Sequence, residues 1–371
     1  MTIGIMTWLH NGNYGTVLQA YALQRYLRNC GYDVSNIDFN ATVSEKVKNL
    51  IRCGNSPKLF LEKFDIARMK KAADPEKMAI RERRFQEFLD TNFNLTKMIS
   101  TYEELKLFSD AFDTYICGSD QIWSPALLNP PYYFDFVSDG KQKISYACSF
   151  CVSSIPEKKK TIIRQLIRRY DHISVREQNG QKIVKDLIGI DVPTTVDPVF
   201  LLDTNDWNMV AAEKAVKGDY VFAFFLTYNK AYVDTAIKTA EQLGVKLVMV
   251  PATREEYGVN AELVQDAGPA EWVSLIKNAK MILTDSFHGC VFSLIYGKPL
   301  LIFKRFKDEN KGSQNSRIYT LVEQYGLEGN IAGSYDSEQV QRVIQRQVAA
   351  SATIEKNAEW SKNWLKAAIS E

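Results

Sequence analysis

The stretch MILTDSFHGCVFSLIYGKPLLIF, residues 281–303, determines the fold that this sequence predicts. Residues 281–283 form a short apolar run typical of a buried strand, and residues 300–303 form a second one. Between them, apolar side chains at helical spacing predict a short helix, which Gly297 ends and Pro299 cannot continue. A strand, a helix and a second strand in this order are the repeating unit of a parallel sheet.

The turn between the first strand and the helix is polar. Three residues there are good helix N-caps: Thr284, Asp285 and Ser286. The residues expected at the carboxyl end of the strand and the N-terminus of the helix are Ser286, Phe287, His288 and Gly289. Helix N-termini favour anions, so a phosphate or carboxylate could bind here. The alternative is that His288, one of only three histidines, merely caps the helix or packs.

The same alternation of strand, loop and helix continues along the chain and predicts α/β architecture with parallel sheets covered by helices. A chain of 371 residues exceeds the size at which one core keeps growing, which favours two domains. The expected domains are residues 1–203, with a helical insertion at about 44–89, and residues 204–350. A C-terminal helix over residues 351–371 could cross back.

The expected strands follow from the apolar runs. In the first domain they are residues 3–8, 34–39, 114–117, 144–151, 172–175 and 194–202. In the second domain they are residues 220–226, 246–250, 281–283 and 300–303.

Composition excludes several classes of protein. Hydrophobic residues make up 46% and charged residues 24%, as in ordinary soluble proteins, and the net charge of +2 indicates no particular partner. No N-terminal signal and no apolar run of about 18 residues is visible, so a cytoplasmic protein is expected. The pair Cys148 and Cys151 lacks the second pair or nearby histidine of a zinc site, and no metal is expected.

Two stretches are basic. Residues 46–84 contain 12 basic and 5 acidic residues, and residues 158–169 contain six positive charges among apolar residues. They can be solvated helix faces or a peripheral contact with anionic lipid at the inner face of a membrane. No nucleic-acid motif accompanies the charge, so no nucleic-acid partner is expected.

Other candidate ligand groups follow predicted strands. Asn13 and Gly15 lie in the loop HNGNYG before a helix, which suits close approach of a ligand but lacks the dinucleotide fingerprint. Asp120 and Gln121 lie in a turn after residues 114–117. Arg176 ends another strand and could hold a carboxylate or phosphate, or could pair with Glu177 or Asp197.

Six motifs together resemble the polysaccharide pyruvyl transferase family, from residue 4 to about residue 324. They are NYGTVLQAYAL (13–23), CGSDQIW (117–123), SVRE (174–177), VDPVFLL (196–202), TDSFHG (284–289) and GKPLLIF (297–303). The resemblance implies two Rossmann-like domains facing a cleft, similar to GT-B glycosyltransferases, with the acceptor on the first domain and the donor on the second. It also implies phosphoenolpyruvate as donor substrate, no cofactor, and a sugar or lipid-linked oligosaccharide of a cell-surface polysaccharide as acceptor. The product would be a pyruvate ketal on two hydroxyls, with release of phosphate.

The predicted site combines these residues. His288, whose unperturbed pKa lies near 6.5, is the candidate acid or phosphate ligand, and Asp120 is the candidate base. The expected substrate-binding residues are Arg176, Ser286, Phe287, Gly289, Lys304, Arg317, Asn13, Gly15 and Gln121. Many family members carry Arg where this chain has Ser286, so another cation must compensate: Arg176, Lys304, Arg305 or Arg317.

Two other functions are also compatible with the sequence. A GT-B glycosyltransferase using a nucleotide sugar would share the fold and a phosphate site at a helix N-terminus. A divergent, non-catalytic family member is the other, because of Ser286.

Overall fold

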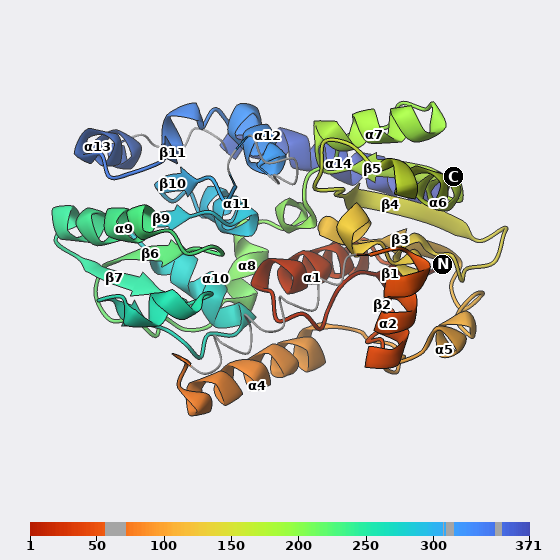
Figure 1. The fold of residues 1–371 in the computed structure, drawn as a ribbon, viewed down its shortest axis with the longest axis horizontal. Helices are drawn as coiled ribbons and strands as arrows, with labels where there is room; N and C mark the ends of the chain where they lie inside the picture. Colours follow the sequence, from red (N-terminus) through yellow and green to blue (C-terminus); the bar gives the residue numbers. More distant parts are fainter. Residues whose placement is uncertain (56–71, 307, 309–314, 346–350) are drawn as a thin grey trace. The chain divides into compact units, whose positions relative to one another are not determined.

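The computed structural model describes residues 1–55, 72–306, 308, 315–345 and 351–371. They fall into two units (Figure 1). Unit 1 contains residues 1–55, 90–202 and 355–371. Unit 2 contains residues 72–89 and the described part of 203–354. The chain passes from one unit to the other between Leu202 and Asp203, beside the break that the sequence predicts.

A five-stranded parallel sheet forms the centre of unit 1, in the order β2-β1-β3-β4-β5. Every residue of β3 is buried, which explains why this strand reads as a continuous apolar run. The strands are β1 (Thr2–Met6), β2 (Asp33–Asn36), β3 (Thr114–Cys117), β4 (Gln142–Cys148) and β5 (His172–Val175). The α-helices are α1 (Tyr14–Asn29), α2 (Val43–Arg52), α5 (Tyr102–Lys106), α6 (Glu157–Ile167), α7 (Gln178–Ile188) and α14 (Ser351–Ser370, in unit 1 from Glu355). Short 3-10 helices are η2 (Gln121–Trp123), η3 (Pro125–Leu127), η4 (Pro130–Tyr133) and η5 (Pro198–Leu201).

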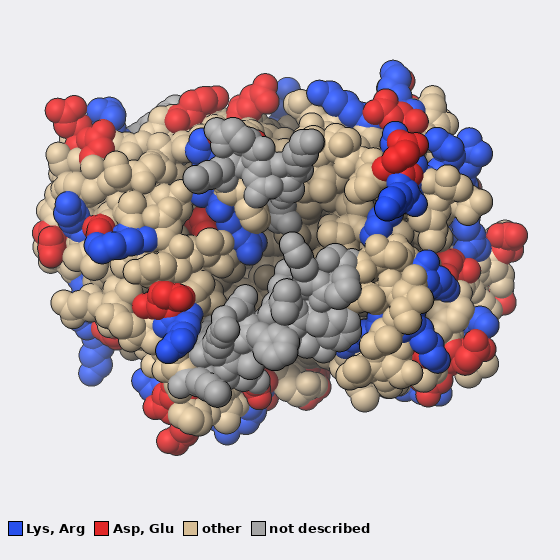
Figure 2. Space-filling model, in the orientation of Figure 1, with Lys and Arg blue, Asp and Glu red and all other residues tan. Residues whose placement is uncertain are grey.

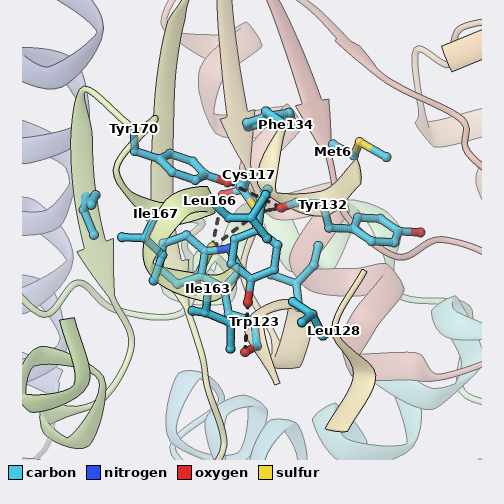
Figure 3. Packing of buried hydrophobic residues seen from close by; sticks show 14 of the residues in the cluster. Met6, Cys117, Trp123, Leu128, Tyr132, Phe134, Ile163, Leu166, Ile167 and Tyr170 are labelled. Atoms are coloured by element: carbon cyan, nitrogen blue, oxygen red, sulfur yellow. Dashed lines mark hydrogen bonds between the residues drawn. The ribbon is translucent and has the colours of Figure 1, made fainter. Parts of the chain in front are cut away.

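Aromatic side chains fill the core on one side of this sheet. The ring of Trp123 stacks on that of Tyr133, with 5.4 Å between centroids, and meets that of Tyr170 edge-on at 5.3 Å. Figure 3 shows α6 contributing apolar side chains, among them Ile163, to the same cluster. Because Trp123 lies three residues after Asp120, this packing fixes the turn that carries Asp120.

Unit 2 is built around a six-stranded parallel sheet in the order β11-β10-β9-β6-β7-β8. Its strands are β6 (Tyr220–Phe224), β7 (Lys246–Met249), β8 (Glu262–Leu263), β9 (Met281–Thr284), β10 (Leu300–Phe303) and β11 (Ile331–Ala332). Its α-helices are α4 (Pro75–Asn92, in unit 2 up to Leu89), α8 (Thr204–Val210), α9 (Lys230–Leu243), α10 (Pro269–Asn278), α11 (Phe287–Ile295), α12 (Ser316–Tyr325) and α13 (Ser337–Gln345). The 3-10 helices are η6 (Arg254–Gly258) and η7 (Glu328–Asn330).

The strand predicted over residues 194–202 was wrong. Thr194 makes only a single bridge with Val175, and Pro198 begins the 3-10 helix η5. The Val196 N–H donates to Ser361 Oγ of α14 at 3.1 Å instead of to a neighbouring strand. Proline lacks a donor for a strand ladder, which explains the outcome.

The helical insertion is also divided differently from the prediction. Helix α4 groups mainly with unit 2, because the Arg84 guanidinium bonds Asp266 Oδ2 at 2.9 Å and approaches Glu271 Oε1 at 3.3 Å. The part of the insertion at residues 56–71 lies outside the described residues. Two strands of two residues, β8 and β11, were not predicted, because such short edges carry no pattern.

Three of the six cations at residues 158–169 bond main-chain carbonyls of unit 1. Lys159 Nζ donates to Pro125 O at 2.5 Å, Arg164 Nε to Leu187 O at 2.8 Å, and Arg169 to two carbonyls of residues 134–137. Figure 2 shows positive and negative side chains interspersed on the face that it presents. No helix in the described part of the chain combines the length and apolar composition needed to cross a membrane.

Candidate functional site

Four charged side chains meet at the carboxyl ends of β3 and β5 in unit 1. We call Arg176, Asp120, Glu177 and Asp197 the Arg176 cluster. The Arg176 guanidinium bonds Asp197 Oδ2 at 2.6 Å and lies 3.5 Å from Asp120 Oδ1 and 3.9 Å from Glu177 Oε2. The second Asp120 oxygen accepts from Thr16 Oγ1 at 2.7 Å, so the first turn of α1 is tied to the same place.

The Arg176 cluster is buried and contains three carboxyl groups for one guanidinium. The side chains of Arg176 and Glu177 are 3% and 2% exposed. Burial alone would lower the pKa of Arg176, but the three carboxylates around it raise that pKa above its ordinary value. With all groups ionised, three carboxylates and one guanidinium leave two negative charges. In the described ranges, no group of three or more His, Cys, Asp or Glu side chains is arranged so that it could hold a metal ion.

The backbone around the cluster is strained. Asp120 has φ 71° and ψ −166°, a region that is almost restricted to glycine. Ala147, at the end of β4, and Cys151, which follows it, also have positive φ values of 50° and 58°. Strain of this kind persists where surrounding structure imposes it, and it is concentrated at functional sites.

The remaining candidate site residues of unit 1 have structural roles. Asn13 caps α1, with its side chain accepting from Thr16 N at 3.2 Å, and Gly15 is buried in the first turn of that helix. Gln121 begins η2 directly after Asp120. Asn13 and Gly15 thus lie within three residues of Thr16, which contacts Asp120.

In unit 2, the turn predicted to bind an anion is present at the carboxyl end of β9. We call residues 285–289 the Ser286 turn. Ser286 is the N-cap of α11, and its Oγ accepts from Gly289 N at 3.3 Å. A Cβ at Gly289 would lie 2.7 Å from Thr284 Oγ1, so only glycine lets α11 begin this close to the strand. His288 is 7% exposed, and its ring meets that of Phe287 edge-on at 5.3 Å.

Two buried carboxylates support this end of the sheet. Asp285 accepts from Leu226 N at 2.6 Å and Thr227 N at 3.1 Å, and burial raises its pKa to about 6. Glu256 accepts from Ala252 N and Thr253 N, and burial raises its pKa to about 7. Glu256 is a site residue that was not predicted from the sequence, although Thr253 and Glu256 have the spacing of a capping box.

Three cations of unit 2 differ in their surroundings. Lys304 is part-exposed and pairs with Asp308 at 2.7 Å, and this bond raises its pKa. Arg305 Nε donates to Thr227 Oγ1 at 3.0 Å, and the main-chain N–H of the same Thr227 donates to Asp285. The Arg317 guanidinium lies 5.8 Å from the centre of the Phe287 ring and is buried. Arg305 and Arg317 are therefore tied to the Ser286 turn, whereas the described contacts of Lys304 lead away from it.

The structure thus brings the predicted residues together in two groups, one in each unit. Asp120 and Arg176 share the first group with Thr16, next to Asn13, Gly15 and Gln121. Ser286, Phe287, His288, Gly289 and Arg317 share the second. That the two groups face one cleft stays a prediction.

The chain was compared with a family model, with curated sequences and with solved structures. Residues 13–305 match the family model of polysaccharide pyruvyl transferase. The fold is similar to that of the UDP-GlcNAc 2-epimerase from Methanocaldococcus jannaschii, at 10% identity, full coverage of both chains and a TM-score of 0.55. It is also similar to a putative UDP-N-acetylglucosamine 2-epimerase from Listeria monocytogenes, at 10% identity, covering 100% of this chain and 95% of that one, with a TM-score of 0.54. No curated protein sequence matches the chain. The predicted fold class, two Rossmann-like units similar to GT-B proteins, is confirmed.

Proposed function

This chain belongs to the polysaccharide pyruvyl transferase family, and from that premise we propose that its donor is phosphoenolpyruvate. The family makes it a transferase that moves a pyruvyl group to a polysaccharide. We further propose that the product is a pyruvate ketal on two hydroxyls of one sugar, released together with inorganic phosphate.

The donor is assigned to the Ser286 turn. Phosphoenolpyruvate carries about three negative charges, two on phosphate and one on the carboxylate. The observation that supports the assignment is the buried N-terminus of α11, with His288 in its first turn and Arg317 against Phe287. The helix dipole and Arg317 favour an anion, and Arg305 replaces the cation that Ser286 does not supply.

The acceptor is assigned to the Arg176 cluster. Its excess of two negative charges would repel a trianion, and Arg176 is already bonded to Asp197. Carboxylates suit sugar hydroxyls, which donate hydrogen bonds to them. Asp120, held by Thr16 in a strained turn, is the base that we propose for hydroxyl activation, and Arg176 positions it.

The reaction balances without any further reactant. A proton adds to the methylene carbon of the donor, which becomes a methyl group, and the adjacent carbon develops oxocarbenium character. One sugar hydroxyl adds to that carbon and loses its proton to the base. The carbon–oxygen bond to phosphate then breaks, and the second hydroxyl adds with loss of its proton. His288 is the proposed acid for carbon or ligand for phosphate.

The test measures phosphate release and product mass with phosphoenolpyruvate and a panel of free, nucleotide-linked and lipid-linked sugars. We expect one phosphate per product and a mass gain equal to one pyruvate less one water. A parallel panel of nucleotide sugars tests the glycosyltransferase alternative. Product formation from a nucleotide sugar, with no phosphate released from phosphoenolpyruvate, would refute the proposal.

A matched pair of variants separates the two assigned roles. Asp120→Asn should bind phosphoenolpyruvate as tightly as the wild type in calorimetry while losing at least about 10²-fold in kcat. Arg317→Met should instead weaken phosphoenolpyruvate binding. Weaker donor binding by Asp120→Asn would move the donor to unit 1.

A further inference from the structure

A histidine and an aspartate form a pair beyond the carboxyl ends of β1 and β2 in unit 1. His10 lies in the loop after β1, and Asp38 follows β2. His10 Nε2 bonds Asp38 Oδ1, and the two side chains are 21% and 9% exposed. A carboxylate only accepts hydrogen bonds, so Nε2 carries the proton, and Nδ1 of the neutral ring is an acceptor. The ring makes no second hydrogen bond to any residue that the structure describes.

Aromatic packing holds both residues of this pair in place. Trp8 precedes His10 in the loop, and its ring meets that of Tyr132 edge-on at 6.3 Å. Phe39, the neighbour of Asp38, meets the same ring edge-on at 6.1 Å. Tyr132 itself belongs to the aromatic core of unit 1 (Figure 3). A part-exposed imidazole that a carboxylate holds in one orientation has the arrangement of a general base.

The pair lies at the same edge of the sheet as Asp120. Strand β1 lies between β2 and β3, and neighbouring strands are about 4.8 Å apart. Gln19 of α1 donates from Nε2 to Thr7 Oγ1 at 3.0 Å, and its Oε1 accepts from Ser119 N at 3.1 Å. The loop that carries His10 is therefore tied to the turn that carries Asp120.

The proposed reaction calls for two bases at this edge. Both sugar hydroxyls lose a proton, and in the overall balance one proton is gained by the methyl group and one leaves with phosphate. Once Asp120 has taken the first proton it is neutral, and it cannot take the second before it has released the first. The other carboxylates of the Arg176 cluster are engaged. Asp197 bonds Arg176 at 2.6 Å, and Glu177 accepts from Ser149 Oγ at 2.7 Å.

We propose that His10 is the catalytic base for the second hydroxyl of the acceptor and that Asp38 positions its ring. The inference rests on the proposed function and adds a residue to its acceptor site. Asp120 takes the proton of the hydroxyl that adds first. After the bond to phosphate has broken, the second hydroxyl oxygen bonds the same carbon while its proton passes to His10 Nδ1. Asp38 stabilises the imidazolium, which then gives its proton to the released phosphate.

The test compares phosphate release with ketal formation in one sample. It uses the full chain, phosphoenolpyruvate and the acceptor on which the wild type acts. Proton NMR identifies the ketal by its methyl group and an enol ether by its vinylic methylene. The wild type should form one ketal for each phosphate.

His10→Gln should form the ketal at least about 10²-fold more slowly than the wild type. Its release of phosphate should fall much less. The carbon that the second hydroxyl does not close then loses a methyl proton, which gives an enol ether, or adds water, which gives free pyruvate. The ratio of phosphate to ketal should therefore rise well above one. This ratio is internal to each sample, so it does not depend on how much of the variant is folded.

His172→Gln is the matched control. The side chain of His172 is 23% exposed, and its Nε2 also lies near a carboxylate, 3.8 Å from Glu371 Oε2. It begins β5, however, and so lies at the opposite end of the same sheet. His172→Gln should keep both the wild-type rate and a ratio of one.

Asp38→Asn tests the positioning role. It should raise the ratio in the same direction as His10→Gln, and the double variant should be no slower than His10→Gln, because both residues act on one proton. A ratio that stays at one in His10→Gln, or ketal formation at the wild-type rate, would overturn the inference and leave the proposed function in place. A wild type that releases no phosphate from phosphoenolpyruvate with any acceptor would refute the proposed function and this inference with it.

Discussion

The Arg176 cluster and the Ser286 turn occupy equivalent places in two parallel sheets, yet they balance charge in opposite ways. Both lie at the carboxyl ends of strands, where ligand sites of open α/β sheets are found. In unit 1, one buried guanidinium offsets three carboxylates. In unit 2, main-chain N–H groups hold the buried carboxylates, and the arginines lie nearby.

This difference assigns separate tasks to two similar positions. The charge of Arg176 is offset by the three carboxylates that surround it, so this guanidinium is not available to bind a trianion. Its role is to hold the carboxylates of the site in place. Carboxylates with a raised pKa are partly neutral near pH 6 to 7, so Asp285 and Glu256 repel an anion less than ionised groups would. The first site is therefore the proposed place for the hydroxyls of the acceptor, and the second is the proposed place for the anionic donor.

The largest expected effect is on stability. Arg176→Met should lower the free energy of unfolding by about 3–5 kcal/mol, because it leaves three buried carboxylates without their cation. Urea denaturation of the full chain measures this difference.

Arg305→Met is the comparison variant, since its guanidinium is bonded near the surface to Thr227. It should unfold within about 1 kcal/mol of the wild type. If Arg176→Met were as stable as the wild type but no longer bound phosphoenolpyruvate, Arg176 would be a donor clamp and the comparison would fail.

The pH dependence of stability probes the carboxylates of unit 2. The pKa of Glu256 is raised from 4.5 to about 7, so the folded state holds its proton more tightly than the unfolded state. The stability that this provides is fully present below about pH 4.5 and is lost as the pH rises through about 7. The loss should be about 3 kcal/mol.

Glu256→Gln isolates this contribution, because glutamine can accept from the same N–H groups and does not titrate. Relative to Glu256→Gln, the unfolding free energy of the wild type should fall by that amount between pH 4.5 and 7.5. Parallel curves for the two proteins would show that Glu256 does not titrate in this range.

His288→Ala tests the catalytic half of the second site. The rate should fall at least about 10²-fold, the lower end of what a general acid or base supplies. Steady-state phosphate release measures it. His288→Gln keeps a hydrogen-bonding side chain of similar size and should be equally slow if the imidazole transfers a proton. Recovery of activity within a few fold in His288→Gln would reduce the histidine to a packing or hydrogen-bonding role.

Much of this comparison could be predicted from the sequence. The spacing of apolar residues and the N-cap residue types located the Ser286 turn. A strand, an N-cap and a short apolar helix can be recognised from residues that are close in the sequence. The pairing of Arg176 with Asp197 was only one of two alternatives, since 21 residues separate them and the fold brings them together. Glu256 was missed for a related reason: its capping box is visible in the sequence, but its complete burial depends on distant residues.

The strand predicted over residues 194–202 is an element that was predicted but does not form. The run is apolar, but Pro198 has no N–H to donate to a neighbouring strand and Asp197 caps the 3-10 helix η5. These residues are therefore buried by packing against α1 and α14, and not by hydrogen bonds of a β-sheet. Apolar content alone did not distinguish these two kinds of burial.

The smallest expected effect concerns the cations that replace the arginine absent at Ser286. Arg305→Met should raise the KM for phosphoenolpyruvate about tenfold, as expected when one charge-assisted bond to the donor is lost. Lys304→Met should raise it about twofold or less, because Lys304 pairs with Asp308 and its charge is screened by solvent. The two residues are adjacent in the chain and equal in charge, so only their surroundings separate them. Initial rates over a range of phosphoenolpyruvate concentrations, at fixed acceptor, give both values. A larger effect from Lys304→Met than from Arg305→Met would assign the donor clamp to Lys304 instead.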